Sequence, residues 1–368
     1  MSAAPAATPP AAPAPSPRDG HKLAVPLALA YLALVVYASL HPFSGWTDRG
    51  VPPLAFLGAA WPRYWTVFDL AVNVAAYIPL GLLLTLALDR LPTRVLPALM
   101  AALLGCGLSL SMEVLQNWLP TRVPSNVDWG TNTLGAAIGA LIGLFGGARW
   151  LIALARFRNR LLAPVPYAEV GLTLLMVWCV TQLSPEFTLF ATGDLRAFLP
   201  LPPALPFDVP LFRVLESVIT GLNVAAVGLF ARTLFGGPRL PWWGGPLAVL
   251  LLLVFGLLTR TLATALILSP AEALAWATPG ALAGLKWGAV ALFVLVWLPP
   301  VPRAILAAFL LTMAVALVNI APENPYSPAA LNVWRQGHFL NFNGLTRLAG
   351  GLWPFVALPF LMLAGRKL

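Results

Sequence analysis

Carboxylate and amide side chains recur at a fixed spacing in two apolar stretches of the chain. Asp69 and Asn73 are four residues apart, as are Asp128 and Asn132, and Tyr77 follows Asn73 by four more. In a helix this spacing places the side chains on one face. Such groups bind hydrogen-bond donors, cations or protons. Because polar groups inside an apolar stretch are costly in a bilayer, they are the first candidates for a functional site.

Glu113 and Gln116 share a helical face in the apolar stretch between those two, and Arg122 lies in the short connection that follows. We expect these groups to converge on one polar site. Its candidate ligand-binding residues are Asp69, Asn73, Tyr77, Glu113, Gln116, Arg122, Asp128 and Asn132. No catalytic residue is assigned, and Glu113 is the candidate general base if the site does chemistry.

A purely structural interpretation of the same residues stays open with equal weight. Asp69 and Asp128 stand where helices begin, and a carboxylate there caps the helix and interacts favourably with its dipole. The deeper polar side chains are then interhelical hydrogen bonds, at about 0.6 kcal/mol each.

A second group of charged residues, Glu216, Arg260 and Lys286, falls in later apolar stretches at similar expected depth. It predicts either interhelical ion pairs or a cationic pocket, with Arg260 and Lys286 as candidates for binding a phosphate or pyrophosphate headgroup. The segment 334–343 combines aromatic rings with amides, which suits sugars or peptides and equally suits a membrane interface.

No metal or cofactor is expected. His41 and His338 lack partners at a metal-ligand spacing, and the chain has no phosphate-binding glycine loop, nucleophile elbow or dinucleotide fingerprint. Whether the protein is an enzyme is left undecided, with the balance toward a non-enzyme.

Composition tells which elements must position these groups. Hydrophobic residues make up 59% of the 368 residues and charged residues only 10%, which is typical of an all-α polytopic membrane protein. Each span needs roughly 20 apolar residues. About ten spans are predicted, near 23–40, 68–88, 96–118, 129–147, 167–184, 211–234, 246–268, 280–298, 302–320 and 348–364.

Lys and Arg between these spans predict the orientation. With both termini in the cytoplasm, inner segments hold 13 of the 22 basic residues, outer segments hold 7, and Arg260 and Lys286 lie inside spans. The excess of positive charge inside favours this arrangement. It places Asp69, Glu113 and Asp128 at the outer leaflet. Because the basic residues form no single patch, the net charge of +9 does not predict nucleic-acid binding.

The chain divides into four predicted parts. Residues 1–21 are an Ala- and Pro-rich disordered tail, 22–148 a four-helix membrane domain, 149–164 an amphipathic segment on the inner leaflet, and 165–368 a six-helix membrane domain. Asn223-Val224-Ala225-Ala226 repeats the Asn73-Val74-Ala75-Ala76 motif, which predicts a degenerate repeat of the four-helix domain within the last part. Cys106 and Cys179 lie in apolar runs and are interpreted as packing residues.

Residues 25–145 resemble the VanZ-like family. The resemblance rests on motifs in the right order: Ser39-Leu40-His41-Pro42, Asp69-x-x-x-Asn73, Pro79-Leu80-Gly81, Glu113-x-x-Gln116, Arg122 and Asp128-x-x-x-Asn132-x-x-Gly135. The family is named for a protein associated with resistance to the glycopeptide antibiotic teicoplanin. The resemblance therefore implies a cell-envelope role in a bacterial plasma membrane.

Three functions remain open at this point. The first is binding of a lipid-linked cell-wall precursor or a glycopeptide-like ligand at the outer leaflet, with membrane lipids as the surrounding partners. The second is a transporter or flippase of an anionic lipid, which the number of spans and the repeat favour. The third is a membrane-embedded transferase or hydrolase using Glu113 or an Asp as general base.

Overall fold

Helices form nearly all of the regular structure in the computed structural model, which describes residues 17–41, 43–61, 67–196, 198–199, 204–322, 324 and 340–365. The helices within these ranges are α1 (Pro17–Leu40), η1 (Ala55–Gly58), α2 (Val67–Ala87), α3 (Val95–Gln116), α4 (Asn126–Leu161), α5 (Ala168–Thr181), α6 (Val209–Leu234), α7 (Gly244–Ile267), η2 (Pro270–Glu272), α8 (Pro279–Leu295), α9 (Pro300–Ile320) and α11 (Leu340–Gly365). None of the described residues belongs to a β-strand. The predicted all-α fold is confirmed.

Each of the ten predicted spans coincides with one α-helix, but the count of ten membrane spans is not confirmed. Within the described ranges seven helices are long and apolar enough to cross a membrane, or eight if the two arms of a bent α4 form one span. The shorter two are α5, with 14 residues, and α8, with 17. Prolines bound both of these helices, since Pro185 follows α5 and Pro299 follows α8.

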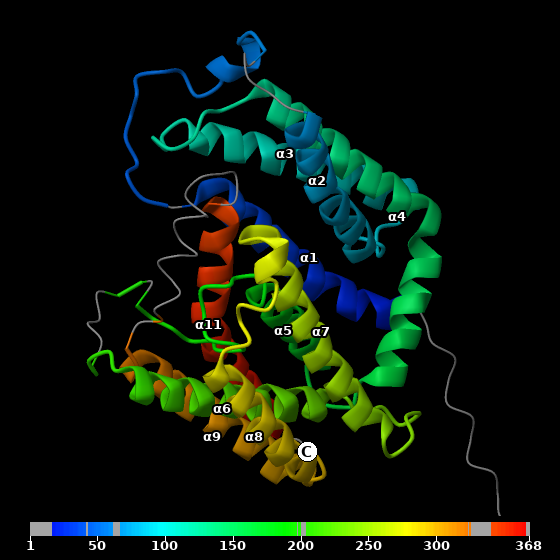
Figure 1. Cartoon of the computed structure of the whole chain (residues 1–368). Coiled ribbons are helices and arrows are strands. Elements are labelled where there is room, and N and C mark those ends of the chain that lie inside the picture. Colours follow the sequence, from blue (N-terminus) through cyan, green and yellow to red (C-terminus); the bar gives the residue numbers. More distant parts are fainter. Residues whose placement is uncertain are drawn as a thin grey trace, which may run out of the picture.

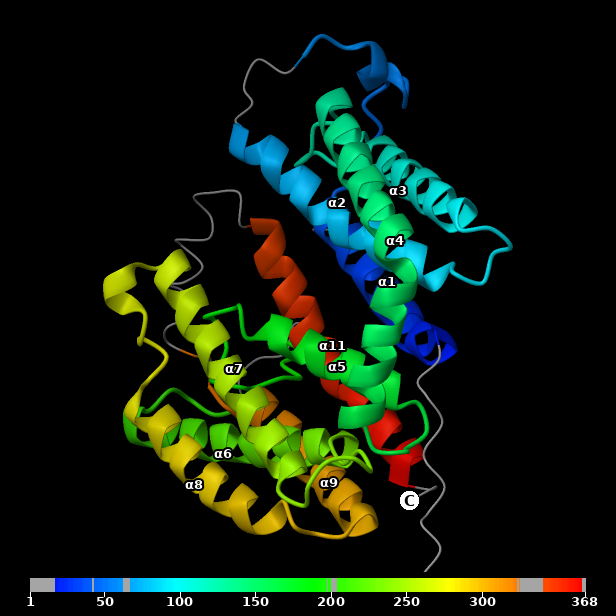
Figure 2. The ribbon, with the colours of Figure 1, turned by 90° about the vertical axis from the view of Figure 1, so that its right-hand side faces the viewer.

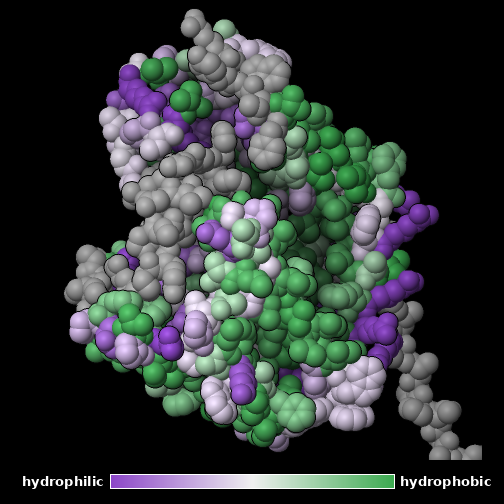
Figure 3. All heavy atoms as spheres, in the orientation of Figure 1, coloured by the Kyte–Doolittle hydropathy of each residue, from purple (hydrophilic) through white to green (hydrophobic). Residues whose placement is uncertain are grey.

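The outer surface of the helices is apolar, as lipid contact requires. Phe145, Leu266 and Phe293 expose 83%, 72% and 74% of their surface. Figure 3 shows hydrophobic residues across the middle of the molecule, with hydrophilic residues gathered at its upper left and along its right edge. An apolar belt between two polar rims is the surface of a membrane protein.

Helices α1 to α4 form one bundle, in which α2 and α4 cross at very short distance (Figure 2). Glycines make this approach possible. An added Cβ would lie 2.0 Å from the Ala136 carbonyl oxygen at Gly81, 2.3 Å from that of Val74 at Gly135, and 2.0 Å from the Ile78 carbonyl oxygen at Gly139. The close crossing brings the first turns of both helices, with Asp69 and Asp128, together.

Helix α4 turns sharply in its middle. The arms Asn126–Gly147 and Arg149–Leu161 differ in direction by 75°. The second arm includes most of the segment predicted to lie on the inner leaflet, and it carries Arg156, Arg158 and Arg160. Arg158 forms an ion pair of 2.5 Å with Glu169 at the start of α5.

The rest of the chain builds a second group of helices, in which α6 packs on α8 and α9, and α11 packs on α5 and α9 (Figure 1). Trp178, Phe230 and Trp353 are fully or almost fully buried at its centre. In Figure 2, α5 and α11 lie between α1–α4 and α6–α9. The degenerate repeat remains a prediction.

Contacts between helix ends show which of them lie at the same end of the molecule. His41, which follows α1, lies so close to Gly344 of α11 that a Cβ there would meet the imidazole at 2.3 Å. At the opposite end, Gly20 packs against the backbone of Leu151, and Gly237 packs against that of Arg160. We call the His41 side the predicted outer end.

The last five residues of the predicted disordered tail belong to a helix. Helix α1 begins at Pro17, so residues 17–21 are helical, and the remainder of the predicted tail lies outside the described residues.

Candidate functional site

The buried carboxylate of Glu113 lies where α3 meets the beginning of α4, at the predicted outer end. Its side chain is 3% exposed, and Oε2 accepts a hydrogen bond of 2.8 Å from the backbone N–H of Ser125. Ser125 is the N-cap of α4, and its hydroxyl accepts from the N–H of Asp128 at 3.2 Å. Glu113 thus fixes the residue that begins α4.

Helices α2 and α4 share a second set of polar contacts. Asn73 donates from Nδ2 to Oδ1 of Asp128 at 3.0 Å, and Asn132, one turn further along α4, donates to the Ser109 hydroxyl of α3 at 3.1 Å. Asp69, in the first turn of α2, interacts electrostatically with Asp128. The predicted shared faces therefore do meet.

Two of the predicted site residues tie the end of α1 to α3 and α4. Gln116 donates to the Ser39 carbonyl oxygen at 3.0 Å, and Arg122 donates to that of Ala38 at 2.8 Å. Both acceptors are orphan carbonyls of a helix C-terminus, where positive donors are favourable. These two side chains thus have a structural role that accounts for their position.

Tyr77 has no such role. It is 4% exposed, and its hydroxyl makes no hydrogen bond to any residue in the described part of the chain. Ser109 and Glu113 are its polar neighbours. The Ser109 hydroxyl accepts a hydrogen bond from Asn132, and its contact with the Tyr77 hydroxyl does not have hydrogen-bond geometry. A buried hydroxyl without a partner costs about 1–3 kcal/mol.

Two carboxylates of this cluster lie near the Arg122 guanidinium. Glu113 and Asp128 both act on Arg122, which forms no direct ion pair with a described residue. Burial lowers the pKa of Arg122, while nearby Glu113 and Asp128 raise it. The arrangement suits a ligand that brings hydrogen-bond donors or positive charge.

The capping interpretation is wrong in one respect. Ser125, not Asp128, caps α4, and the Asp128 carboxylate lies in the first turn, where it accepts from Asn73. Asp69 is likewise in the first turn of α2, two residues after its beginning. The position of each aspartate in the first turn of its helix is as the sequence indicated, but the N-cap of α4 is Ser125.

Three residues that sequence reasoning missed hold the segment 43–61 against this end. Asn117 donates to the Val51 carbonyl oxygen at 3.0 Å, Asn126 to that of Ala59 at 2.7 Å, and Arg49 to that of Leu119 at 2.9 Å. Figure 1 shows this segment beside the beginning of α4 and the end of α3. Asparagines flanking the helix ends were the available signal.

The structure does not bring the second candidate group together. Arg260 is 1% exposed and donates to the Ser184 carbonyl oxygen and to Gln182 beyond the end of α5. Lys286 is exposed on α8, with Nζ 5.8 Å from the centroid of the Trp287 ring. Glu216 accepts a hydrogen bond from Thr278 instead. The ion pairs and the shared cationic pocket predicted for these residues are absent from the described part of the chain.

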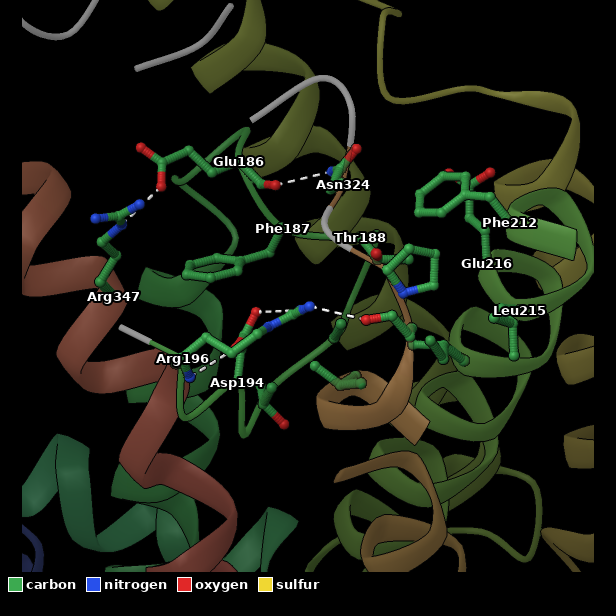
Figure 4. Close-up of a pocket in the computed structure, with 17 residues that line it drawn as sticks. Glu186, Phe187, Thr188, Asp194, Arg196, Phe212, Leu215, Glu216, Asn324 and Arg347 are labelled. Carbon is green, nitrogen blue, oxygen red and sulfur yellow. Dashed lines mark hydrogen bonds and ion pairs between the residues drawn. The ribbon is translucent and has the colours of Figure 1, made fainter. Parts of the chain in front are cut away.

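A cavity of about 350 Å³ was not predicted from the sequence. It lies at the predicted outer end between α6, α9, α11 and the segment 186–196 (Figure 4). Two ion pairs line it: Arg347 to Glu186 at 2.7 Å and Arg196 to Asp194 at 2.8 Å. The signal for it was polar side chains, such as Glu216, in apolar stretches.

Two further predictions concern the segment 334–343 and the absence of a metal site. Most of the segment 334–343, including His338, lies outside the described residues, and for its remaining positions only the helical backbone is described. Within the described ranges, no three His, Cys, Asp or Glu side chains are grouped as a metal site would require.

Residues 24–147 match the model of the family described as VanZ/LLP1, and the rest of the chain lies outside that family domain. No curated protein and no solved structure matches the chain. The match covers α1 to the bend in α4 and includes all eight residues of the predicted polar site. The predicted resemblance is confirmed for residues 24–147, which we call the VanZ/LLP1 domain after the family that they match, and a second group of helices follows them.

Proposed function

We propose that this membrane protein acts in the cell envelope by binding a polar headgroup at the outer end of α1–α4. The ligand is a lipid-linked cell-wall precursor or a glycopeptide-like molecule, and its binding affects the tolerance of the cell to glycopeptides such as teicoplanin. The observation that carries the proposal is the buried Glu113 carboxylate beside the Tyr77 hydroxyl, which makes no hydrogen bond within the described part of the chain.

The composition of the cluster supports this class of ligand. Gln116 and Arg122 have structural partners, whereas Tyr77 and one oxygen of Glu113 have none among the described residues. Sugars, peptide stems and glycopeptides carry hydroxyl, amide and ammonium groups, which donate to carboxylates. Partly exposed Asp128 and Asn73 offer a route to the buried pair.

The clearest test is Tyr77→Phe, which removes only the unpartnered hydroxyl. Because that hydroxyl bonds to no described residue, the variant should fold and accumulate normally. Loss of one hydrogen bond should weaken binding about tenfold. Calorimetry measures binding of teicoplanin, and separately of a polyprenyl-linked disaccharide peptide, to purified protein. Teicoplanin tolerance is measured in cells that produce equal amounts of each variant.

Tyr31→Phe is the matched control, because the Tyr31 hydroxyl donates to the Ala76 carbonyl oxygen on a neighbouring helix. It should lower stability slightly and leave binding unchanged. Glu113→Gln keeps an acceptor for Ser125 and removes only the charge, so it should also weaken binding. The proposal fails if Tyr77→Phe and Glu113→Gln bind both probes as well as the unaltered protein.

A further inference from the structure

The cavity at the ends of α6, α9 and α11 lies outside the VanZ/LLP1 match, and it has the features of a second, independent ligand site. Its volume of about 350 Å³ is that of a small-molecule pocket. Its walls are the ends of three helices that are long and apolar enough to span a membrane. It therefore lies at the depth where lipid headgroups meet water.

The described lining of the cavity has three carboxylates but only two guanidinium groups. Glu186 is paired with Arg347, and Asp194 with Arg196. These two pairs lie on the left and in the centre of Figure 4, and Glu216 of α6 lies on the right behind Phe212. Glu216 forms no ion pair with a described residue, and Arg213, which acts on it from one turn earlier in α6, is not part of the lining. The described lining therefore holds one more carboxylate than guanidinium groups.

Packing against α8 holds the Glu216 carboxylate in place without neutralising it. The residue is 8% exposed, and Oε1 accepts a hydrogen bond of 2.6 Å from Thr278, the N-cap of α8. A Cβ at Gly280 would lie 2.2 Å from Oε2, so a glycine is needed to make room for this oxygen. Oε2 itself accepts no hydrogen bond from the described residues.

A second polar group in the cavity lining also lacks a partner. Thr192 is 2% exposed, and its hydroxyl makes no hydrogen bond within the described part of the chain. It precedes Gly193, whose φ of +85° bends the segment 186–196 into the cavity wall. An isolated buried hydroxyl is unfavourable unless an occupant of the cavity bonds to it.

The remaining walls are apolar, with the rings of Phe187 and Phe212 and the side chains of Leu215, Ile219 and Val318. Apolar walls with a few polar groups favour an amphiphile. Two acceptors that lack donors select a group that carries N–H bonds and positive charge. Aromatic faces in the same lining also favour a cation.

We propose that this cavity binds the primary ammonium group of an amphiphile, with Glu216 as its counter-charge and Thr192 as a hydrogen-bonding partner. The ammonium belongs either to an aminophospholipid headgroup or to a free amine. This site does not depend on the function proposed for α1–α4.

Native mass spectrometry of the full chain in detergent micelles tests the proposal. The probes are phosphatidylethanolamine, phosphatidylcholine and phosphatidylglycerol with identical acyl chains. Retained phosphatidylethanolamine should exceed the other two at least fivefold, because only it offers N–H donors with positive charge. Glu216→Gln should abolish this preference. Competition by hexylamine identifies a free amine as a ligand, and selectivity that hexylamine leaves intact identifies the lipid headgroup.

Two variants keep the result interpretable. Glu169→Gln alters a buried glutamate at the opposite end of the molecule, beside Arg158, and should keep the preference. Ala191→Leu fills the cavity without changing its charge, so it should lower retention even if Glu216→Gln does not fold. Equal retention of the three lipids by the unaltered protein would overturn the proposal, as would a preference that survives both Glu216→Gln and Ala191→Leu.

Discussion

His41 lies between positive charges from two parts of the chain. Arg122 belongs to the VanZ/LLP1 domain and Arg347 to α11, and both act on the imidazole. The hydroxyl of Tyr37, one turn earlier in α1, is 2.9 Å from Nδ1. Burial lowers the pKa of His41 from its usual 6.5, and the two guanidinium groups lower it further. The folded protein therefore holds this ring neutral.

The shift predicts how stability depends on pH. Because the unfolded chain binds this proton more readily than the folded one, the contribution of His41 is complete above about pH 6.5 and is lost as the pH falls below it. Its size is below about 1 kcal/mol, since the ring is partly exposed and solvent screens the charges. Thermal unfolding in detergent at pH 5 and pH 7.5 should show a smaller difference for His41→Gln than for the unaltered protein.

His21→Gln is the control, because His21 lies near the beginning of α1, at the opposite end. It should keep the pH difference of the unaltered protein. An equal pH difference in His41→Gln and the unaltered protein would contradict this prediction, because it would mean that His41 binds its proton equally well in the folded and the unfolded chain.

Residue spacing predicted which polar side chains share a face but not which partners they find. Asp69, Asn73, Asp128 and Asn132 converge as their four-residue spacing indicates. The backbone acceptors of Gln116 and Arg122 at the end of α1 depend on how three helices pack. No local pattern encodes such contacts, so the sequence did not predict that Gln116 and Arg122, two of the eight predicted site residues, bind the end of α1.

At the scale of the elements, the α2–α4 crossing depends on glycines with no room for a side chain. Gly139→Ala places a methyl group where the Ile78 carbonyl oxygen lies 2.0 Å away, so one helix has to shift. Overpacking of this kind costs about 1–3 kcal/mol. Denaturation by dodecyl sulfate, followed by circular dichroism, should show that loss.

Gly107→Ala makes the same chemical change on α3, where a Cβ would have nothing within 4 Å. It should be neutral or stabilise the protein by up to about 1 kcal/mol, because alanine favours helix. If the two variants lost equal stability, the close packing of α2 against α4 would not explain the loss in Gly139→Ala.

Apolar stretches predicted the position of each α-helix in the described ranges. They could do so because a long apolar run can be recognised from neighbouring residues alone. Helix lengths were less predictable. The span predicted at 167–184 extends beyond the end of α5 at Thr181, because the chain turns at Pro185 and reaches Phe190 with a φ of +64°. Those turns depend on contacts with α7 and α11 that lie far away in sequence.

Orientation in the membrane is a property of the whole molecule that the excess of inner basic residues predicts. In a background without Cys106 and Cys179, Asp48→Cys at the predicted outer end should react with an impermeant thiol reagent added to intact cells. Arg160→Cys, which is exposed at the opposite end, should react only after the membrane is opened. The reverse labelling pattern would place the polar cluster of α1–α4 in the cytoplasm.

The cavity beside Glu216 could not be predicted from the sequence. Its walls come from the segment 186–196, the beginning of α6, the end of α9 and the first turns of the apolar part of α11. Each stretch looks ordinary alone. The charge imbalance appears only after Arg196 and Arg347 have found their partners.

The contact between His41 and Gly344 joins the VanZ/LLP1 domain to a helix that lies nearly two hundred residues beyond it in the sequence. A chain cut after residue 147 would leave the imidazole of His41 facing lipid or water on that side. In such a chain, a neighbouring molecule or a different loop would have to cover this surface.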